Sequence, residues 1–187
     1  MKKVLLLASG SGSNVENIIN YFATTSHDIS FEVIANKKDA GVFERAKRLQ
    51  IPAHYYPKSR FENGDFAQFV KNFQPDLIVL AGFLLLFPAD VVKDFPNKII
   101  NIHPALLPNY GGKGMYGHHV HEAVLANKEA FTGITIHYVN EQYDKGEIIL
   151  QEKTNIENCT TADEIAQKVH ELEYKFFPIV VEKLLFG

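Results

Sequence analysis

Three polar residues with complementary chemistry stand out in a sequence otherwise built on apolar runs. Asn101 and His103 lie at the end of an apolar stretch, and Asp144 follows in the turn Tyr143-Asp144-Lys145-Gly146. Because side chains alternate across a strand, Asn101 and His103 are expected to project from one face. An amide, an imidazole and a carboxylate can together stabilise an oxyanion and move a proton. The three residues therefore predict group transfer without a metal or a covalent intermediate.

The elements that position these residues follow a regular alternation in the first half of the chain. Short Val/Ile/Leu-rich runs predict strands at 3–8, 30–36, 52–56, 76–81 and 98–102, and helical patterns fall near 13–24, 40–49, 63–73 and 88–95. Near-continuous apolarity is typical of parallel strands covered on both faces. The order predicts an α/β fold with a Rossmann-like, doubly wound, mostly parallel sheet, in which ligands bind beyond the carboxyl ends of the strands.

The second half is less regular. Prolines and glycines predict a long loop over 104–117, followed by a helix near 117–127 and strands at 133–139 and 147–152 that form an antiparallel extension. The chain closes with a long amphipathic helix, which begins at a capping box of Thr161 and Glu164. Pro178 is expected to kink or restart this helix. No linker is evident, so residues 1–187 are expected to form a single domain with a subdomain division near residue 100.

A glycine loop, Gly10-Ser11-Gly12-Ser13-Asn14, follows the first predicted strand and opens the first predicted helix, where Ser13 and Glu16 suggest a capping box. Free amides at such a helix start can hold a phosphate. A dinucleotide fingerprint would place glycine at Val15 and an acidic residue near the end of the second strand, where Asn36 stands. The loop therefore favours a single phosphate monoester over a nicotinamide cofactor, and an unliganded tight turn is the alternative.

Composition bounds the class of protein. The 187 residues are 46% hydrophobic and 22% charged, with a net charge of −3, which gives no general signal for nucleic acid or membrane binding. The longest uncharged apolar run, 77–89, falls well short of the roughly 20 residues of a membrane helix. Cys159 is the one cysteine, which fits a reducing compartment. A soluble, cytoplasmic protein is expected.

Taken together, the motifs resemble the folate-dependent formyltransferases, and within them the glycinamide ribonucleotide transformylases. The resemblance rests on residues 8–14, 81–83, 101–108, 133–139 and 143–146, which occur in the family's order across almost the whole chain. It implies transfer of a formyl group from 10-formyltetrahydrofolate, the cosubstrate, to the amine of 5-phosphoribosylglycinamide in de novo purine synthesis. It also implies a nucleotide-binding subdomain over 1–100 and a catalytic, folate-side subdomain over 101–187.

The resemblance assigns roles residue by residue. Asn101 would donate to the developing oxyanion, His103 would stabilise it as an imidazolium, and Asp144 would keep His103 charged and help relay the amine proton. His137 would support these groups. The phosphate and nucleotide would be held by Gly12, Ser13, Asn14 and Glu173. The folate would lie against Phe83, Leu84, Leu85, Leu86 and Phe87, together with Asn101.

The match departs from the family in its basic residues and its loop. Two basic positions that commonly grip the folate tail lack counterparts, and Lys58, Arg60 and Lys113 are the candidates to replace them. The glycine-rich stretch 110–117 resembles a subgroup of the same enzymes and is expected to act as a mobile lid. His118 and His121 have the spacing of a metal-binding pair on a helix, but no third ligand is obvious, so a solvated helix face is the preferred interpretation and no metal is expected.

Other functions remain as alternatives. A sugar-nucleotide formyltransferase is the nearest, disfavoured modestly by the phosphate-fitted loop. A formyltetrahydrofolate hydrolase is expected to carry a domain before the glycine loop, and a methionyl-tRNA formyltransferase a longer, more basic C-terminal region. A non-catalytic nucleotide-binding module is disfavoured because Asn101, His103 and Asp144 are all present. A hydride-transfer enzyme is disfavoured by Val15 and Asn36.

Overall fold

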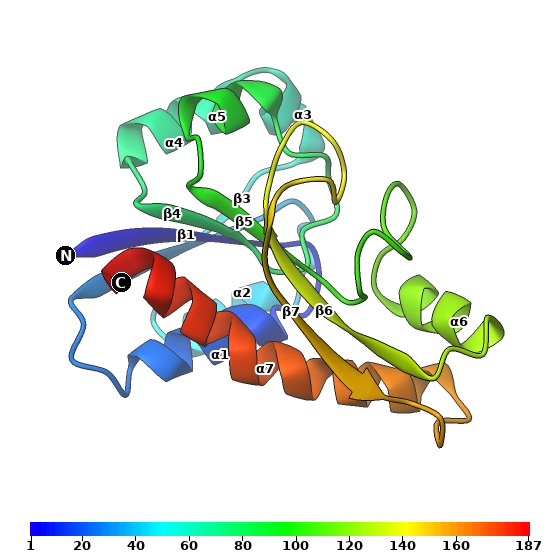
Figure 1. Cartoon of the computed structure of the whole chain (residues 1–187). Helices are drawn as coiled ribbons and strands as arrows, with labels where there is room; N and C mark the ends of the chain where they lie inside the picture. The colour runs from blue at the N-terminus through cyan, green and yellow to red at the C-terminus, as the bar shows by residue number, and fades with distance from the viewer.

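Seven strands form one sheet in the computed structural model, which describes residues 1–187, in the order β3-β2-β1-β4-β5-β6-β7 (Figure 1). The strands are β1 (Lys2–Ala8), β2 (Ile29–Ala35), β3 (Ala53–Tyr55), β4 (Leu77–Leu80), β5 (Ile99–His103), β6 (Phe131–Tyr138) and β7 (Ile148–Asn155). The first five pair in parallel, whereas β6 and β7 are antiparallel to their neighbours. The predicted fold class is confirmed, including its antiparallel extension.

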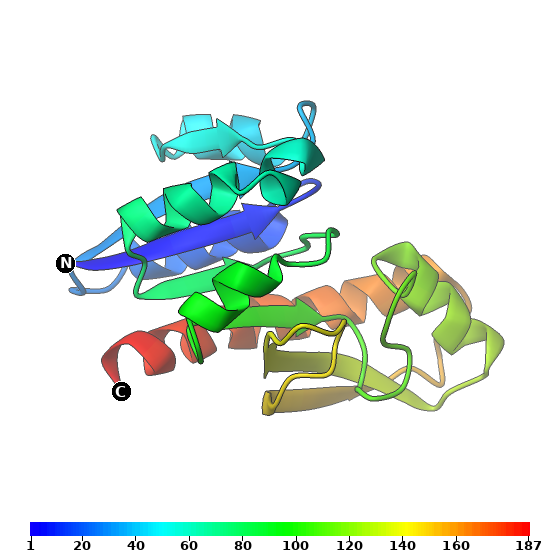
Figure 2. The ribbon, with the colours of Figure 1, turned by 90° about the horizontal axis from the view of Figure 1, so that it is seen from above.

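Helices cover both faces of this sheet (Figures 1 and 2). They are α1 (Ser13–Phe22), α2 (Val42–Arg48), α3 (Lys58–Glu62), α4 (Asp65–Phe73), α5 (Ala89–Asp94), α6 (His118–Ala126) and α7 (Ala162–Phe186). Alternate residues of β1 divide the core. Val4 and Leu6 join a cluster of 30 buried residues with α1, α2, α6 and α7, whereas Leu5 and Leu7 join a cluster of 15 with α3, α4 and α5. No helix is long and apolar enough to cross a membrane.

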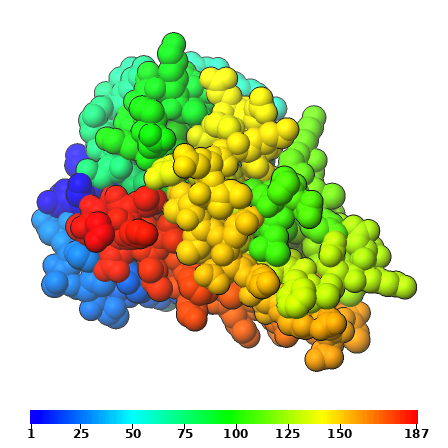
Figure 3. All heavy atoms as spheres, in the orientation of Figure 1, coloured from blue at the N-terminus to red at the C-terminus, as the bar shows by residue number.

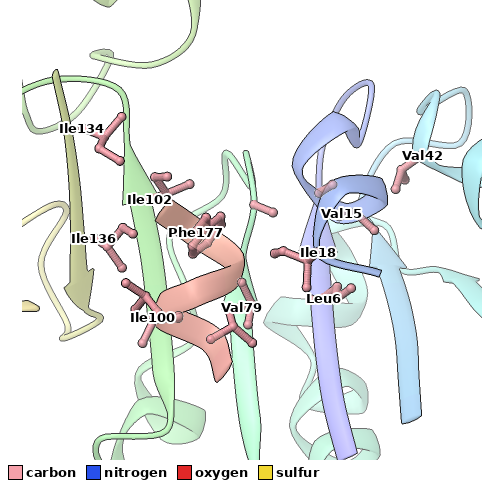
Figure 4. Packing of buried hydrophobic residues seen from close by; sticks show 14 of the residues in the cluster. Leu6, Val15, Ile18, Val42, Val79, Ile100, Ile102, Ile134, Ile136 and Phe177 are labelled. Atoms are coloured by element: carbon pink, nitrogen blue, oxygen red, sulfur yellow. The ribbon is translucent and has the colours of Figure 1, made fainter. Parts of the chain in front are cut away.

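The larger cluster ties the C-terminal helix to the middle of the sheet. Figure 4 shows Phe177 of α7 lying among Val79 of β4 and Ile100 and Ile102 of β5. Phe177 is fully buried, so the contact removes a large apolar surface from water, which stabilises the folded state by roughly 2–3 kcal/mol. This packing fixes α7 against the strands that carry the candidate catalytic residues.

Two predicted boundaries need correction. The helix expected over 63–73 begins at Asp65 and is preceded by a separate short helix, α3, because Gly64 adopts a left-handed φ of 90° between them. Glycine takes this conformation without steric cost, so the chain can turn there. The strand predicted at 147–152 extends to Asn155, since its partner β6 already begins at Phe131.

Helix α7 passes through Pro178 without restarting, which contradicts one of the two outcomes expected there. Proline has no N–H, so the carbonyl of Tyr174, four residues earlier, has no partner within the helix. The side chain of Asn17, on α1, supplies it: its Nδ2 donates to the Tyr174 carbonyl oxygen at 2.9 Å. Helix continuity is therefore preserved by a hydrogen bond between two helices.

We expect Asn17→Ala to lower the free energy of unfolding by about 1 kcal/mol, because it leaves this carbonyl without its protein partner. In a Pro178→Ala background the same substitution should cost much less, since the introduced alanine then offers its own N–H to the Tyr174 carbonyl. Urea denaturation of the four proteins measures both effects. Equal losses in the two backgrounds would show that Asn17 acts in some other way.

Candidate active site

A cleft of about 650 Å³ opens beyond the carboxyl ends of β1, β4 and β5, where a doubly wound sheet binds its ligands. Its walls come from residues 9–14, 80–87, 101–104, 112–117 and 142–144, with His121, His137, His170 and Glu173. Figure 3 shows the 140–147 turn (yellow) on the surface between the green segments of α5 and of the 104–117 loop. All of the residues predicted for catalysis and for phosphate binding line this one cleft.

Asn101 and His137 face each other across the β5–β6 pair, in which they are register partners. The Asn101 amide Nδ2 donates to His137 Nε2 at 3.2 Å, and the opposite ring nitrogen, Nδ1, lies 2.8 Å from the Tyr138 carbonyl oxygen. Because a carbonyl only accepts, the proton of a neutral His137 lies on Nδ1 and Nε2 accepts from Asn101. The contact from Asn101 Nδ2 to Asp144 Oδ1 is 3.5 Å long and correspondingly weak. The Asn101 N–H that points toward Asp144 is therefore the one that can most easily donate to a ligand instead.

His103 is 3% exposed and lies between a carbonyl and a carboxylate. Its Nε2 is 2.6 Å from the Tyr110 carbonyl oxygen, which places a proton on Nε2, and its Nδ1 is 3.6 Å from Asp144 Oδ2. Burial lowers the pKa of His103 below its ordinary value, although the charge of Asp144 and the Tyr110 carbonyl act in the opposite direction. Asp144 thus favours the imidazolium, as expected, but in the structure without ligand desolvation outweighs this effect. The neutral ring keeps a free electron pair on Nδ1.

Asp144 reaches these residues from a tight turn. Its backbone lies in the left-handed region, with φ 54°, which Asp tolerates better than most residues. A Cβ at Gly146 would lie only 1.6 Å from the Tyr138 carbonyl oxygen, so only glycine allows the turn to close on β6. The Gly112 N–H donates to Asp144 Oδ2 at 2.9 Å. Burial would raise the pKa of Asp144, but the adjacent imidazoles of His137 and His103 and the Gly112 N–H together lower it, so the carboxylate is ionised.

Thr135 is a supporting residue to which the sequence patterns assigned no role. It pairs with His103 across β5 and β6 and is fully buried. Its Oγ1 donates to the Ala105 carbonyl at 2.7 Å and accepts from the Leu107 N–H at 3.0 Å and from Gln151 Nε2 at 2.9 Å. The hydroxyl thus fixes the chain just after His103. The one sequence feature that could have indicated this role is the position of a polar residue inside an apolar strand.

The phosphate end is built on the start of α1. The residue that caps α1 is Gly12, with φ 73° and no side-chain capping bond, so the predicted Ser13/Glu16 capping box is wrong. Glu16 instead forms ion pairs with Arg45 and Arg48, which keep its side chain away from the helix start. The N–H groups of the first helical turn consequently have no side-chain competitor, and an anion can bind there. A Cβ at Gly12 would lie 2.3 Å from Val42, so no other residue fits.

Glu173 joins this end from α7. Its Oε2 accepts from Asn14 Nδ2 at 3.0 Å and lies 2.8 Å from His170 Nδ1, and only 5% of the residue is exposed. The hydrogen bond to Glu173 raises the pKa of His170, with burial opposing it. Asn14, His170 and Glu173 therefore form a connected polar group from two helices that are far apart in the sequence. His170 was not singled out from the sequence, where it looks like any solvated helix residue.

The segment predicted to meet folate divides into exposed and buried members. All five residues line the cleft, but Phe83 and Phe87 are only 8% and 4% exposed and belong to the smaller core cluster, against which Leu85 also packs. Leu84 and Leu86 are the members outside that cluster. The segment is anchored through Ser9, whose Oγ accepts from the Leu84 N–H at 2.9 Å and donates to Asn36 Oδ1 at 2.6 Å. Asn36 therefore binds Ser9, whereas the acidic residue at this position of a dinucleotide-binding fingerprint would bind a ribose.

The remaining candidates separate clearly. His118 is exposed beside Glu122 and Asp163, as a solvated helix face requires, but His121 is 3% exposed, which contradicts that interpretation for His121. No group of three or more His, Cys, Asp or Glu side chains is placed to hold a metal ion.

The basic side chains considered for the folate tail also differ in position. Lys58 pairs with Glu62 at 3.2 Å, whereas Arg60 pairs with Asp65 at 3.1 Å and covers the Tyr56 ring. Lys113 is the one of these three candidates that lines the cleft. Lys37, not considered from the sequence, lines it as well.

The sequence was also compared with models of known protein families. A family model described as formyl transferase matches residues 2–181. The chain belongs to this family. The family inferred from the sequence motifs is thereby confirmed.

Individual relatives carry a more specific name. The chain is 38% identical over 189 residues to the chloroplastic phosphoribosylglycinamide formyltransferase of Arabidopsis thaliana, covering 96% of this chain but only 64% of that protein's length. It is 36% identical to the phosphoribosylglycinamide formyltransferase of Bacillus subtilis, covering 99% of this chain and 95% of the relative. The crystal structure of the Bacillus halodurans phosphoribosylglycinamide formyltransferase superposes with a TM-score of 0.86 at 34% identity, over 100% of this chain and 96% of that one.

The buried imidazole of His121 predicts a pH dependence of stability. Burial, and then the charge of His170, lower its pKa to about 4 from an unfolded value near 6.5. Between these values the unfolded chain binds the extra proton, so the contribution of His121 is fully present above pH 6.5 and is lost as the pH falls toward 4. The difference amounts to at most about 3 kcal/mol.

We expect His121→Phe to flatten the fall in unfolding free energy between pH 6.5 and 4, and the exposed control His119→Asn to leave it unchanged. Urea denaturation at several pH values gives both slopes. A slope for His121→Phe equal to that of the unmodified protein would mean that His121 is not the group responsible.

Proposed function

We propose that this protein transfers the formyl group of 10-formyltetrahydrofolate to the amine of 5-phosphoribosylglycinamide, giving formylglycinamide ribonucleotide and tetrahydrofolate in purine biosynthesis. The observation that carries the proposal is the single cleft, which holds Asn101, His103 and Asp144 at one end and the open start of α1 with Glu173 at the other. A phosphorylated amine can therefore be held by its phosphate while its amine reaches the polar trio. The names of the relatives support the same activity.

The reaction requires a hydrogen-bond donor that stabilises the developing oxyanion. When the amine attacks the formyl carbon, the carbonyl oxygen gains negative charge and needs an N–H partner. Asn101 Nδ2 is proposed as that donor, because its bond to His137 orients the amide while its 3.5 Å contact with Asp144 is easily exchanged for the oxyanion. Loss of one such donor in other enzymes costs roughly 3 kcal/mol of transition-state stabilisation.

The attacking amine must also lose a proton, and the leaving nitrogen of the folate must gain one. Neutral His103 has a free electron pair on Nδ1, so it is proposed to accept the proton as the tetrahedral intermediate forms. The resulting imidazolium would be stabilised by Asp144, 3.6 Å away, and would lie close to the oxyanion. His103 would then return the proton to the folate nitrogen as the carbon–nitrogen bond breaks. The charge on His103 thus arises during the reaction.

The folate is proposed to lie along residues 84–86. Their apolar side chains offer a surface for a flat heterocycle, and the backbone groups of Leu85 and Leu86 make no hydrogen bond within the protein. Because Lys113 lines the cleft, it is proposed to bind the glutamate tail of the folate.

We also propose the subdomain division into 1–100 and 101–187, a cytoplasmic location, and action on small molecules as a monomer or homodimer.

The deciding assay is release of tetrahydrofolate from 10-formyltetrahydrofolate, followed by absorbance with and without 5-phosphoribosylglycinamide. Release only in the presence of the amine, with the formylated product identified by mass, is expected. Release without the amine would indicate a hydrolase. If neither occurs, amino-sugar nucleotides are the next substrates, because they suit the nearest alternative enzyme class.

Asp144→Asn should reduce turnover by about 10²–10⁴-fold while the fold is retained, because the neutral amide cannot stabilise the His103 imidazolium. Glu141→Gln is the matched control, since Glu141 lies in the same turn but is exposed and outside the cleft. Near-normal turnover of Asp144→Asn, with its fold verified by circular dichroism, would remove Asp144 from the mechanism.

A further inference from the structure

The loop that follows β5 contacts both His103 and Asp144 within one short stretch. The Tyr110 carbonyl oxygen lies 2.6 Å from His103 Nε2. The Gly112 N–H donates to Asp144 Oδ2 at 2.9 Å, and a Cβ at Gly111 would lie 3.4 Å from the Asp144 Cβ. Residues 110–112 therefore carry one hydrogen-bond partner of the imidazole and one of the carboxylate.

Two acceptors compete for the single proton of the neutral His103 ring. Asp144 Oδ2 lies 3.6 Å from Nδ1 and, because it is ionised, favours a proton on that nitrogen. The Tyr110 carbonyl, at 2.6 Å, favours the proton on Nε2. The carbonyl prevails because 3.6 Å exceeds the usual length of an N–H···O hydrogen bond. Displacement of this carbonyl would therefore shift the proton toward Nδ1.

The side chain of Tyr110 is held outside the cleft, at the end of α6. Its hydroxyl donates to Glu129 Oε1 at 2.6 Å and accepts from Asn127 Nδ2 at 2.8 Å. Its ring packs against the larger core cluster, and none of these three residues lines the cleft. Tyr110 thus connects two places: its carbonyl binds the imidazole of His103, and its hydroxyl is bound at the helix end.

The end of α6 that binds the hydroxyl has a well-defined backbone. Asn127 is the C-cap of the helix, and Lys128 follows it with a left-handed φ of 53°. The Lys128 N–H donates to the Leu125 carbonyl at 3.0 Å, and the Glu129 N–H donates to the Val124 carbonyl at 3.3 Å. These are the two bonds of a Schellman motif, which fixes the backbone on both sides of the turn. Both partners of the Tyr110 hydroxyl are carried by this motif.

Tyr110 needs an anchor because its own backbone conformation is unfavourable. Its left-handed φ of 56° is uncommon for a residue with a large side chain. Strained conformations of this kind persist only where the surrounding structure holds them. The hydroxyl bonds to α6 supply such a restraint. When they are removed, the peptide after Tyr110 is freer to rotate, and its carbonyl loses its alignment with His103.

We propose that Tyr110 is a positioning residue for the formyl transfer, whose hydroxyl, bound by Asn127 and Glu129, holds its carbonyl against His103 Nε2. The proton is thereby kept on Nε2, and Nδ1 keeps the electron pair that the reaction uses. An imidazole in the other tautomer carries its proton on Nδ1 and cannot accept one there. The inference rests on the proposed function and extends it by naming a residue outside the cleft that sets the tautomer of the proposed base.

Tyr110→Phe removes the hydroxyl and keeps the ring. The variant should lower kcat by about fivefold to tenfold, the effect of losing one hydrogen bond, and should leave KM for both substrates nearly unchanged. NMR shifts of the two ring nitrogens of His103, measured without substrate, should show Nε2–H in the unmodified protein and a larger share of Nδ1–H in the variant. Tyr55→Phe, which removes an exposed hydroxyl from β3, is the control and should change neither result.

Glu129 supplies a second variant that leaves the tyrosine in place. Glu129→Ala should lower kcat and shift the tautomer as Tyr110→Phe does. Glu129→Gln retains an oxygen that accepts from the hydroxyl, so it should restore most of the kcat lost in Glu129→Ala. Because Tyr110→Phe and Glu129→Ala remove the same hydrogen bond, the double variant should lose little more activity than either single one.

An unchanged His103 tautomer in a folded Tyr110→Phe protein would overturn the inference, even if the variant were less stable, because it would reveal a purely structural tyrosine. Additive losses of kcat in the double variant would overturn it as well. Both outcomes leave the proposed function intact. Absence of turnover by the unmodified protein would instead remove the proposed function and, with it, the role of Tyr110 in the reaction, whatever the tautomer of His103.

Discussion

The antiparallel pairing of β5 with β6 is the constraint on which the candidate site depends. It places Asn101 opposite His137 and His103 opposite Thr135, so one register pairs two members of the polar trio with the residues that support them. A slip of one residue would turn every side chain of β6 to the other face and separate these pairs. The irregularity between Ile136 and His137 in the β6–β7 pairing lies at the same place, as β-bulges beside active sites often do.

Within this frame, backbone carbonyls decide where the imidazole protons lie. The Tyr138 carbonyl fixes Nδ1–H on His137, and the Tyr110 carbonyl fixes Nε2–H on His103. Tyr110 itself has a left-handed φ of 56°, so the loop after β5 adopts an unusual backbone conformation where its carbonyl meets the histidine. Burial keeps His103 neutral despite Asp144, and its free electron pair follows from that balance. His121 Nδ1 has no such carbonyl partner.

Most of the fold was predictable because its signals are local. Apolar runs identified the strands, and the Thr161/Glu164 capping box is present at the start of α7 as expected. The errors have a common physical origin in contacts between distant segments. The Ser13/Glu16 capping box is absent because Gly12, which lies against Val42 of α2, is the N-cap of α1, and Glu16 pairs with Arg45 and Arg48 of α2. The restart at Pro178 fails because Asn17 supplies the bond that proline removes.

The candidate site divides in the same way. The trio of Asn101, His103 and Asp144 was recognisable because residue type and strand position suffice for it. The neutral state of His103 and the burial of His121 could not be recognised from the sequence, because desolvation depends on what the tertiary structure packs around each ring. Thr135 and His170 were missed for a related reason: their roles lie in partners on other elements.

Glu173 shows how packing and function are joined in one helix. Ile165, Val169, Glu173, Phe177 and Val181 are spaced four residues apart, and all are buried, so the carboxylate occupies a position of the apolar stripe itself. A buried carboxylate is costly unless it has hydrogen-bond partners, and Asn14 and His170 provide them. Phe177, one turn further on, is held in the core by β4 and β5, so Glu173 is fixed at the cleft. The core that stabilises the fold therefore also sets the distance between the phosphate end and the chemical end of the site.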